Sequence, residues 1–487
     1  MARSAIWATH QLTIVLAVVQ IAFLVILALF GTHAPAALPG GTPTVVHQVN
    51  YTDFQDVHVV LIVGFGFLVA FLRRYGFASF GLSLLLAALT IQWALIVRGL
   101  ISIEFQDAGK FHVTIANLIQ ADFTAIVVLV SFGALVGKLS PIQYIVLAIL
   151  EVPASLASEW LVLRKLEVQD VGGAVVVHVF GAVFGIVVSR ILYKKQWQQS
   201  DDADSVYHSE VISFIGVAFL WLFWPSLNAV ATTGDARQRA IVNTYVAIAT
   251  STIASFLASQ FINKKHQFNA RQAINAAIAG GVALGASANI LLEPFHAALV
   301  GVVSGLAAIG AFQTITPKLN AKGAHDTRGV FAVHGIPGII GSLASVIFLA
   351  CYQNNSFPES QKILGKERNN AKQAGAQLVG LIAAIIVAAI TAAITGIILK
   401  LKIWAFVNDQ AIFSDTGIFD VPEDYEFTTR VVSHIDKVQL QEQIPIGGVS
   451  STSKEIIPVP GAGPVVSVDE TEKLTAPGAT DATPVEA

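Results

Sequence analysis

Long apolar runs recur along most of this chain of 487 residues. A helix needs about 20 consecutive apolar residues to cross the hydrocarbon core of a bilayer, and the recurring runs have that length. They lack the strict alternation of apolar and polar residues that is typical of a membrane β-barrel. The runs therefore predict an all-α polytopic membrane protein with about 12 transmembrane helices. The expected spans are residues 11–30, 57–72, 80–98, 115–137, 141–163, 171–192, 210–231, 240–263, 271–292, 294–313, 329–351 and 374–400.

The composition excludes several classes of protein. Only 13% of the residues are charged and 54% are hydrophobic, whereas ordinary soluble proteins carry roughly 25% charged residues. This balance argues against a soluble enzyme and against a disordered protein. The net charge of -3 offers no basic surface for phosphates, so no nucleic-acid partner is expected. A single cysteine, Cys351, excludes a disulfide scaffold and a multi-cysteine metal site. The lipid bilayer is the expected environment.

Lysine and arginine residues in the short loops predict the orientation of the spans. If the N-terminus is cytoplasmic, the inside loops carry a modest excess of these residues, so we expect both termini on the cytoplasmic side of the plasma membrane. Two sequons then fall in outside loops, which makes Asn50 and Asn354 candidate glycosylation sites. The first span is either a transmembrane helix or a cleaved signal peptide, because residues 34–36 fit a small-residue cleavage site.

One pattern of an acid, a glycine and a histidine occurs twice. Asp170 is followed at a fixed offset by His178, and Asp326 is followed at the same offset by His334. Each copy places an acid at the mouth of a span and a histidine about 12 Å deeper, because a helix rises 1.5 Å per residue. The two spans run in opposite directions in the expected topology. The pattern therefore indicates an inverted, pseudo-twofold repeat, a plan that recurs in transporters with a site at the midplane.

The two histidines are the strongest candidates for a site. His178 and His334 are costly at bilayer depth unless they face a cavity or each other. A neutral imidazole has one donor and one acceptor nitrogen, so two rings can hydrogen-bond edge to edge and line a narrow pore for a small polar guest. The alternative is two satisfied core histidines in unrelated helices. No third ligand of a suitable type lies at comparable depth, so we expect no metal and no other cofactor.

Five segments resemble the Rhesus branch of the ammonium transporter family. They are NLIQADF at 117–123, DVGGAVVVH at 170–178, WPS at 224–226, VHGIPG at 333–338 and DVPEDYEF at 420–427. The resemblance runs from about residue 50 to 427, and the order and spacing of the segments are specific. It implies an ammonium transporter fold with an extra first helix at 11–30, and a homotrimer with one pore through each subunit.

The resemblance also implies roles for individual residues. His178 and His334 match the paired pore histidines of the family, and Asp170 matches the acid near the outer end of the first of these helices. Phe123 matches the outer of two stacked phenylalanines that gate the external vestibule. The second gate position reads Leu227, where many relatives have phenylalanine. Leucine excludes water by its bulk but offers no ring face to a cation.

The remaining acids keep two interpretations each. Glu159 matches an acidic vestibule position, where it attracts cations toward the mouth, or it is a snorkelling interface residue. Asp170 caps its helix as well as acting in transport, and for Asp326, the acid of the second copy, capping is the safer interpretation.

On this resemblance the chain is an Rh-type ammonium/ammonia transporter or channel and not an enzyme. Ammonium is recruited at an outer vestibule and loses its proton there, and ammonia passes the twin histidines. The reason is that a charge at the membrane centre costs several kcal/mol. Methylammonium is a further expected substrate, and conduction of carbon dioxide is an alternative that an apolar pore would admit. An ammonium sensor that signals through its tail is the alternative from another class.

The composition changes after Lys402 to Pro, Ser, Thr, Val, Asp and Glu. Residues 1–402 form the expected transmembrane transport domain, and residues 403–487 form a cytoplasmic tail. From about residue 445 the tail is expected to be disordered, because it cannot bury enough apolar surface to offset its conformational entropy.

Overall fold

The structure is a computed structural model, and it describes residues 2–40, 51–353, 356–357, 363–366, 368–408 and 411–422. The described residues up to Val421 belong to one compact unit. The candidate glycosylation sites Asn50 and Asn354 lie outside the described residues. So does the part of the tail beyond residue 445.

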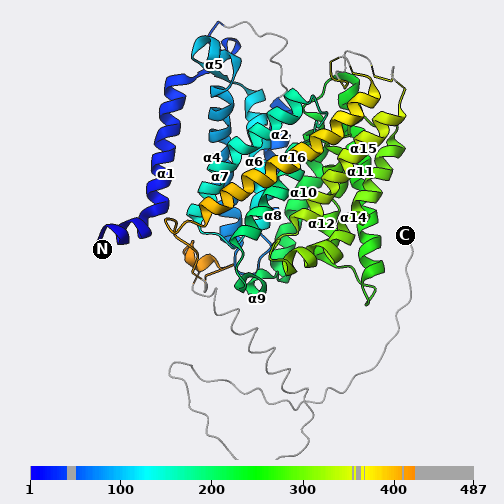
Figure 1. The fold of residues 1–487 in the computed structure, drawn as a ribbon. Helices are drawn as coiled ribbons and strands as arrows, with labels where there is room; N and C mark the ends of the chain where they lie inside the picture. Colours follow the sequence, from blue (N-terminus) through cyan, green and yellow to red (C-terminus); the bar gives the residue numbers. More distant parts are fainter. Residues whose placement is uncertain are drawn as a thin grey trace, which may run out of the picture. The chain divides into compact units, whose positions relative to one another are not determined.

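The described part of the chain is mostly helical (Figure 1). The helices are α1 (Ala2–Phe30), α2 (Tyr51–Val59), α3 (Gly66–Leu68), α4 (Gly76–Leu100), α5 (Ile103–Ala108), α6 (Ile115–Leu135), α7 (Pro141–Glu159), α8 (Phe180–Leu192), α9 (Gln196–Gln199), α10 (Tyr207–Ala229), α11 (Gly234–Ile262), α12 (Ala270–Ala276), α13 (Ala279–Leu284), α14 (Pro294–Ala321), α15 (Ile336–Cys351) and α16 (Asn370–Leu399). Four π-helical turns are η3 (Val60–Phe65), η4 (Trp160–Lys165), η5 (Ala174–Val179) and η7 (Phe331–Gly335), and three 3₁₀ turns are η1 (Pro35–Ala37), η6 (Asp201–Ala203) and η9 (Asp415–Gly417).

Ten helical segments in the described residues are long and apolar enough to cross a membrane. They match ten of the expected spans, and the chain is an integral multi-pass membrane protein. The other two expected spans, 57–72 and 271–292, are helical but interrupted. In the first, α2 continues through the π-helical turn η3 into α3, and in the second a short break separates α12 from α13. The first interruption contains Gly64, and glycine weakens a continuous helix.

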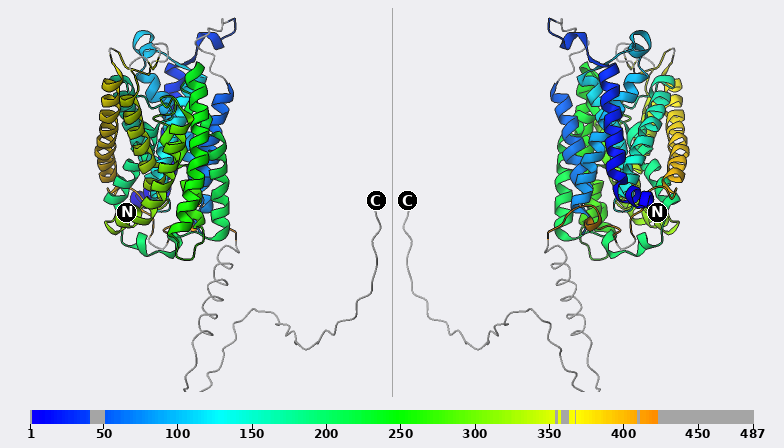
Figure 2. Two further views of the ribbon diagram at one scale, coloured as in Figure 1. Left: turned by 90° about the vertical axis from the view of Figure 1, so that its right-hand side faces the viewer. Right: turned by 90° about the vertical axis from the view of Figure 1, so that its left-hand side faces the viewer.

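The first helix stands at the edge of the bundle (Figure 1 and the right-hand view of Figure 2). Most apolar side chains of α1 beyond His10 are at least partly exposed, as suits a helix that faces lipid. It contacts α4 through the rings of Phe23 and Trp93, whose centroids are 5.5 Å apart. A short parallel pair of strands, β1 (Gly31–His33) and β2 (Phe111–Val113), ties its end to the segment before α6.

Glycines at small-xxx-small spacing, such as Gly181 with Gly185 and Gly301 with Gly305, allow the helices to approach closely. A Cβ on Gly301 of α14 would lie 2.3 Å from the carbonyl oxygen of Ala247 in α11. A Cβ on Gly181 of α8 would lie 2.8 Å from the carbonyl oxygen of Val127 in α6. Both distances are too short for a real side chain, so these contacts require glycine.

The last long helix and the start of the tail close the bundle. In Figure 1, α16 crosses obliquely over the bundle, and it packs against α7, α8 and α15. Further on, the carboxylate of Asp415 accepts hydrogen bonds from the backbone N–H groups of Phe77 (3.1 Å) and Ala78 (2.7 Å) at the start of α4. Asp415, beyond Lys402, is therefore tied to the bundle, and the expected domain boundary at residue 402 stays a prediction.

Candidate functional site

The first copy of the repeated pattern begins with a buried acid. Asp170 Oδ2 accepts hydrogen bonds from the backbone N–H groups of Val175 (2.9 Å) and Val176 (2.8 Å). Gly173, which lies between Asp170 and these two valines in the chain, has a φ of 73°, a left-handed conformation that favours glycine. This turn starts the π-helical turn η5, which carries His178. Asp170 therefore caps its helix, as the sequence predicts.

The second copy has the same local structure. Asp326 Oδ1 accepts hydrogen bonds from the N–H groups of Gly329 (3.0 Å) and Val330 (2.9 Å). Gly329 has a φ of 81°, and the π-helical turn η7 that follows carries His334. Capping by Asp326 is confirmed. The shared sequence of cap, left-handed glycine, π-helical turn and histidine fits the expected internal repeat.

The two repeats bring their histidines together. The ring centroids of His178 and His334 are 5.1 Å apart, and the ring planes differ by 18°. Their residues are 1% and 3% exposed. Neither nitrogen of His178, nor Nδ1 of His334, has a hydrogen-bond partner among the described residues. The expected edge-to-edge hydrogen bond is thus not formed. The alternative of two distant, separately satisfied histidines is wrong.

Two further aromatic rings enclose the histidine pair. Phe65 lies 5.8 Å from His334, and Trp224 lies 5.5 Å from His178, measured between ring centroids. Phe65 and Trp224 are 6.4 Å apart. We call these four residues the ring cluster. Trp224 Nε1 is also buried without a hydrogen-bond partner in the part of the chain that the structure describes. The cluster therefore combines apolar ring faces with polar nitrogens that no described protein group satisfies.

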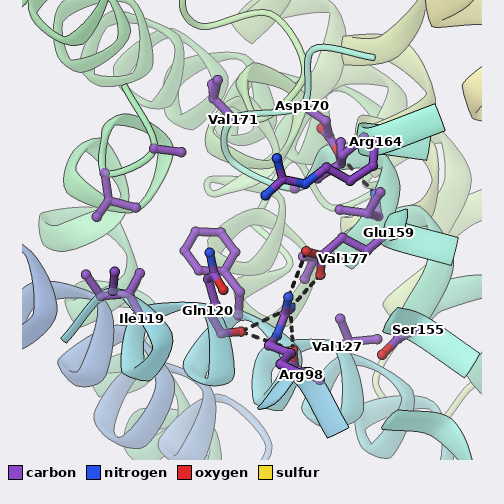
Figure 3. Close-up of a pocket in the computed structure, with 18 residues that line it drawn as sticks. Arg98, Ile119, Gln120, Val127, Ser155, Glu159, Arg164, Asp170, Val171 and Val177 are labelled. Carbon is purple, nitrogen blue, oxygen red and sulfur yellow. Dashed lines mark hydrogen bonds and ion pairs between the residues drawn. The ribbon is translucent and has the colours of Figure 1, made fainter. Parts of the chain in front are cut away.

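One cavity brings together several of the sequence-predicted residues (Figure 3). Its volume is about 340 Å³. Phe123, Glu159 and Asp170 all line it, as do Val176 and Val177, which directly precede His178. We call this cavity the vestibule. Because its wall includes the residues next to His178, it approaches the ring cluster from one side.

Leu227 does not take part in the wall of the vestibule. Its side chain is buried in the core, at 1% exposure, and it is absent from the described lining, to which Val230 and Ala231 contribute from the end of α10. Phe123, by contrast, is only partly buried and faces the cavity. A role of Leu227 as a second gate residue stays a prediction.

Glu159, one of the two acids that line the vestibule, is already paired. Arg98, in the last turn of α4, donates to Glu159 Oε1 at 2.9 Å and to Oε2 at 2.5 Å. It also donates to Thr124 Oγ1 of α6 at 3.0 Å. The dashed lines in Figure 3 show this arrangement. The carboxylate of Glu159 is therefore paired, and its negative charge is compensated by a guanidinium group that lines the same cavity.

A second polar region lies beside the capping acid of the second copy. There a cavity of about 230 Å³ is lined by residues that include His325, Asp326 and Arg328. Buried Lys138 donates to Ser189 Oγ at 3.0 Å and to the carbonyl oxygen of His325 at 2.5 Å. Burial lowers the pKa of Lys138, and the nearby carboxylate of Asp326 opposes that shift. Burial also raises the pKa of Asp326.

Comparison with known proteins identifies the family. A sequence model described as the Ammonium Transporter Family matches residues 18–412. The chain belongs to the ammonium transporter family. Among curated relatives in this family, Ammonium transporter Rh type B of Sus scrofa is 38% identical over 384 residues, 77% of this chain and 83% of that protein. Ammonium transporter Rh type C of Canis lupus familiaris is 38% identical over 389 residues, 78% of this chain and 84% of that protein.

Solved structures of family members agree with the fold. One is Rh50 of Nitrosomonas europaea, from the Rhesus protein family of channels. It is 28% identical to this chain with a TM-score of 0.68, and the match covers 81% of this chain and 98% of the Rh50 chain. Mep2 of Saccharomyces cerevisiae, with a TM-score of 0.57 and 20% identity, covers 75% of this chain and 90% of its own, and shows the fold alone. The resemblance to the Rhesus branch of the ammonium transporter family is confirmed.

The structure places four further residues at the ring cluster or in the vestibule, and the sequence alone indicates no role for them. Phe65 and Trp224 complete the ring cluster, and Arg98 and Arg164 line the vestibule. The signal for Phe65 is a flanking pair of glycines inside an apolar span. In the described residues no group of three or more His, Cys, Asp or Glu side chains is arranged to hold a metal ion.

Proposed function

We propose that this protein conducts ammonium nitrogen across the membrane. Ammonium enters the vestibule near Phe123, Glu159 and Asp170 and loses its proton there. Ammonia then passes His178 and His334 in an apolar pore. The observation that carries this proposal is the ring cluster, in which two buried imidazoles present nitrogens without partners beside apolar rings.

The chemistry of ammonia suits such a passage. Ammonia has three N–H donors and one lone pair, and a neutral imidazole supplies one acceptor and one donor nitrogen. Buried polar atoms without partners are costly, so a small polar guest that satisfies them in passing is stabilised. An ammonium or potassium ion would carry a charge to bilayer depth, which costs several kcal/mol. Potassium cannot lose a proton, so this route rejects it.

The capping acids support the position of the histidines. The carboxylate of Asp170 fixes the start of η5, and that of Asp326 fixes the start of η7. Each histidine lies in the π-helical turn that directly follows its capping acid and glycine. We infer that the caps set the depth and rotation of the two rings, which makes Asp170 and Asp326 positioning residues. A direct role for Asp170 in ammonium binding is part of the same proposal, since it lines the vestibule.

We further propose that the protein is a homotrimer in the plasma membrane with both termini in the cytoplasm. The membership of the Rhesus branch supports the trimer with one pore in each subunit. The excess of Lys and Arg in the inside loops supports the orientation. Exposed apolar side chains such as Leu222 of α10 and Leu257 of α11 supply a surface that lipid or a neighbouring subunit covers.

The experiment that tests the function is a flux assay on the reconstituted protein. Liposomes that contain the protein and a pH-sensitive dye are mixed rapidly with ammonium or methylammonium chloride, while membrane current is recorded in parallel. We expect lumenal alkalinisation several-fold faster than in protein-free liposomes, and no faster potassium flux. Equal rates with and without protein would contradict the proposal. A parallel pulse of carbon dioxide separates ammonia conduction from general gas conduction.

A further inference from the structure

The strongest unassigned feature of the vestibule is the ion pair between Arg98 and Glu159. Three helices meet at this pair, because Arg98 ends α4, Glu159 ends α7 and Thr124 of α6 accepts a further hydrogen bond from the guanidinium. The side chains are 15% and 30% exposed, so the pair is shielded more than an ordinary surface ion pair. A bidentate pair of this kind fixes both partners. The carboxylate of Glu159 is therefore held in place by the protein and reaches the cavity as a paired group, with its charge compensated by Arg98.

The charges that line the vestibule are balanced in a particular way. Arg98, Glu159, Arg164 and Asp170 are its charged lining residues. The carboxylate of Asp170 accepts two backbone N–H groups from its own helix, and that of Glu159 is held by Arg98. Arg164 has no ion-pair partner among the described residues, and in Figure 3 its guanidinium extends over the cavity between Asp170 and Gln120. The charge of Glu159 is thus compensated by Arg98, whereas Asp170 Oδ1 has no hydrogen-bond partner among the described residues.

We propose that Arg98 is a specificity-determining residue of the vestibule, and this rests on the function proposed above. By pairing with Glu159, Arg98 lowers the affinity of the mouth for monovalent cations. The benefit is selectivity. An unpaired carboxylate would attract sodium and potassium as readily as ammonium, because all carry the same charge. Alkali cations cannot lose a proton, so they would occupy the mouth without passing. A neutralised acid leaves the mouth open at high salt.

Two variants that each remove one charge of the ion pair test this assignment, because they should shift the apparent ammonium affinity in opposite directions. The measured quantity is the ammonium concentration that gives half-maximal flux in the liposome assay. Removing one unit charge about 10 Å from a bound cation changes its affinity by roughly two- to seventeenfold at effective dielectric constants between about 80 and about 20. We expect a roughly two- to seventeenfold lower half-saturating concentration for Arg98→Gln and a roughly two- to seventeenfold higher one for Glu159→Gln. The double variant should return close to the wild-type value.

Alkali salt supplies a second readout. Potassium chloride should inhibit ammonium flux through Arg98→Gln more strongly than through the wild type, with choline chloride of equal ionic strength as the reference. Lys165→Gln is the matched control, because Lys165 lies over the ring of Trp160 at 4.9 Å and outside the vestibule lining. It removes the same charge nearby, and its half-saturating concentration should stay at the wild-type value.

The outcomes separate this inference from the proposed function. If the wild-type protein does not accelerate flux, the proposed function fails. If it does, but Arg98→Gln and Glu159→Gln keep the wild-type half-saturating concentration or shift it in the same direction, the inference alone is overturned. Should Arg98→Gln not fold, Glu159→Gln and the double variant still test the sign of the effect. With any of these variants, the assignment would also be overturned if Lys165→Gln changed the half-saturating ammonium concentration by an equal amount.

Discussion

The imidazole rings of His178 and His334 lie 5.1 Å apart, centroid to centroid, although they belong to π-helical turns that are widely separated in the sequence. Both rings are buried, and the described protein groups leave three of their four nitrogens without a hydrogen bond. A guest between or beside these rings can reach both. This relationship is the basis of the predictions for the pore.

A charge introduced at either ring should change the pore. In His178→Asp or His334→Asp, a carboxylate replaces a neutral ring, and a buried charge at this depth costs several kcal/mol. We expect ammonia flux to fall at least about tenfold, or a cation current to appear, since 1.4 kcal/mol corresponds to a factor of ten. Flux and current in liposomes measure both. His208→Asp, at an exposed position of α10, is the control. Wild-type flux in both pore variants would argue strongly against a shared site.

The cap at Asp170 can be separated from its charge. Asp170→Ala leaves the N–H groups of Val175 and Val176 without their acceptor, and loss of such a cap costs about 0.5–2 kcal/mol. We expect lower thermal stability and transport that is abolished or greatly reduced. Asp170→Asn keeps an oxygen acceptor but removes the charge. If Asp170→Asn transports normally, the residue acts only as a cap, and if Asp170→Ala does so as well, it is dispensable.

Leu227→Phe tests whether the second gate position reaches the vestibule. The leucine is 1% exposed, so a larger ring must displace its neighbours. Overpacking of this kind costs about 1–3 kcal/mol. We expect a lower melting temperature and an unchanged half-saturating ammonium concentration, because the residue is not part of the vestibule wall. A lower half-saturating concentration would instead show that a second ring recruits the cation.

The tight contact between α13 and α15 should depend on Gly341. A Cβ at this position would lie 1.8 Å from the carbonyl oxygen of Ala283, and backbone cannot move aside as a flexible side chain can. We expect Gly341→Ala to lower stability by about 1–3 kcal/mol or more. The control is Gly375→Ala in α16, where nothing lies within 4 Å. It should leave stability unchanged or raise it by up to about 1 kcal/mol, since alanine favours a helix. Thermal unfolding in detergent compares the two.

The stability of the protein should fall in acid partly because of His325. Burial, helped by the positive charges of Lys138 and Arg271, lowers the pKa of His325 to about 3. The unfolded chain binds a proton below about pH 6.5, whereas the folded protein does so only below about pH 3. Stability is therefore lost as the pH falls from about 6.5 toward 3, by at most about 1.4 kcal/mol per pH unit for this group.

The matched experiment for this pH dependence uses His325→Gln. Thermal unfolding in detergent at about pH 7.5 and about pH 5 gives the acid-induced loss of stability for each protein, and over this range His325 accounts for up to about 2 kcal/mol. We expect a smaller loss in the variant than in the wild type. An equal or larger loss in His325→Gln would show that this histidine is not held neutral in the folded protein.

The spans and the two caps were accessible from the sequence because they depend on local features. Apolar runs of membrane length define helices wherever the backbone must satisfy its own hydrogen bonds. Asp170 and Asp326 act within a few residues of their position, and the repeat around them predicted that His178 and His334 would meet. Family resemblance added Phe123 and Glu159 to the vestibule, where the structure has them.

The sequence alone determined that this protein crosses the membrane many times and carries two equivalent histidine turns. Only the tertiary structure decided which groups surround them. Phe65 reaches the ring cluster through an interrupted span, Arg98 neutralises Glu159, and Leu227 turns into the core. The physical reason is that helices which are apolar on most sides have little periodicity to fix their rotation. Their relative rotation and tilt follow from close packing between segments distant in the chain, which no local pattern records.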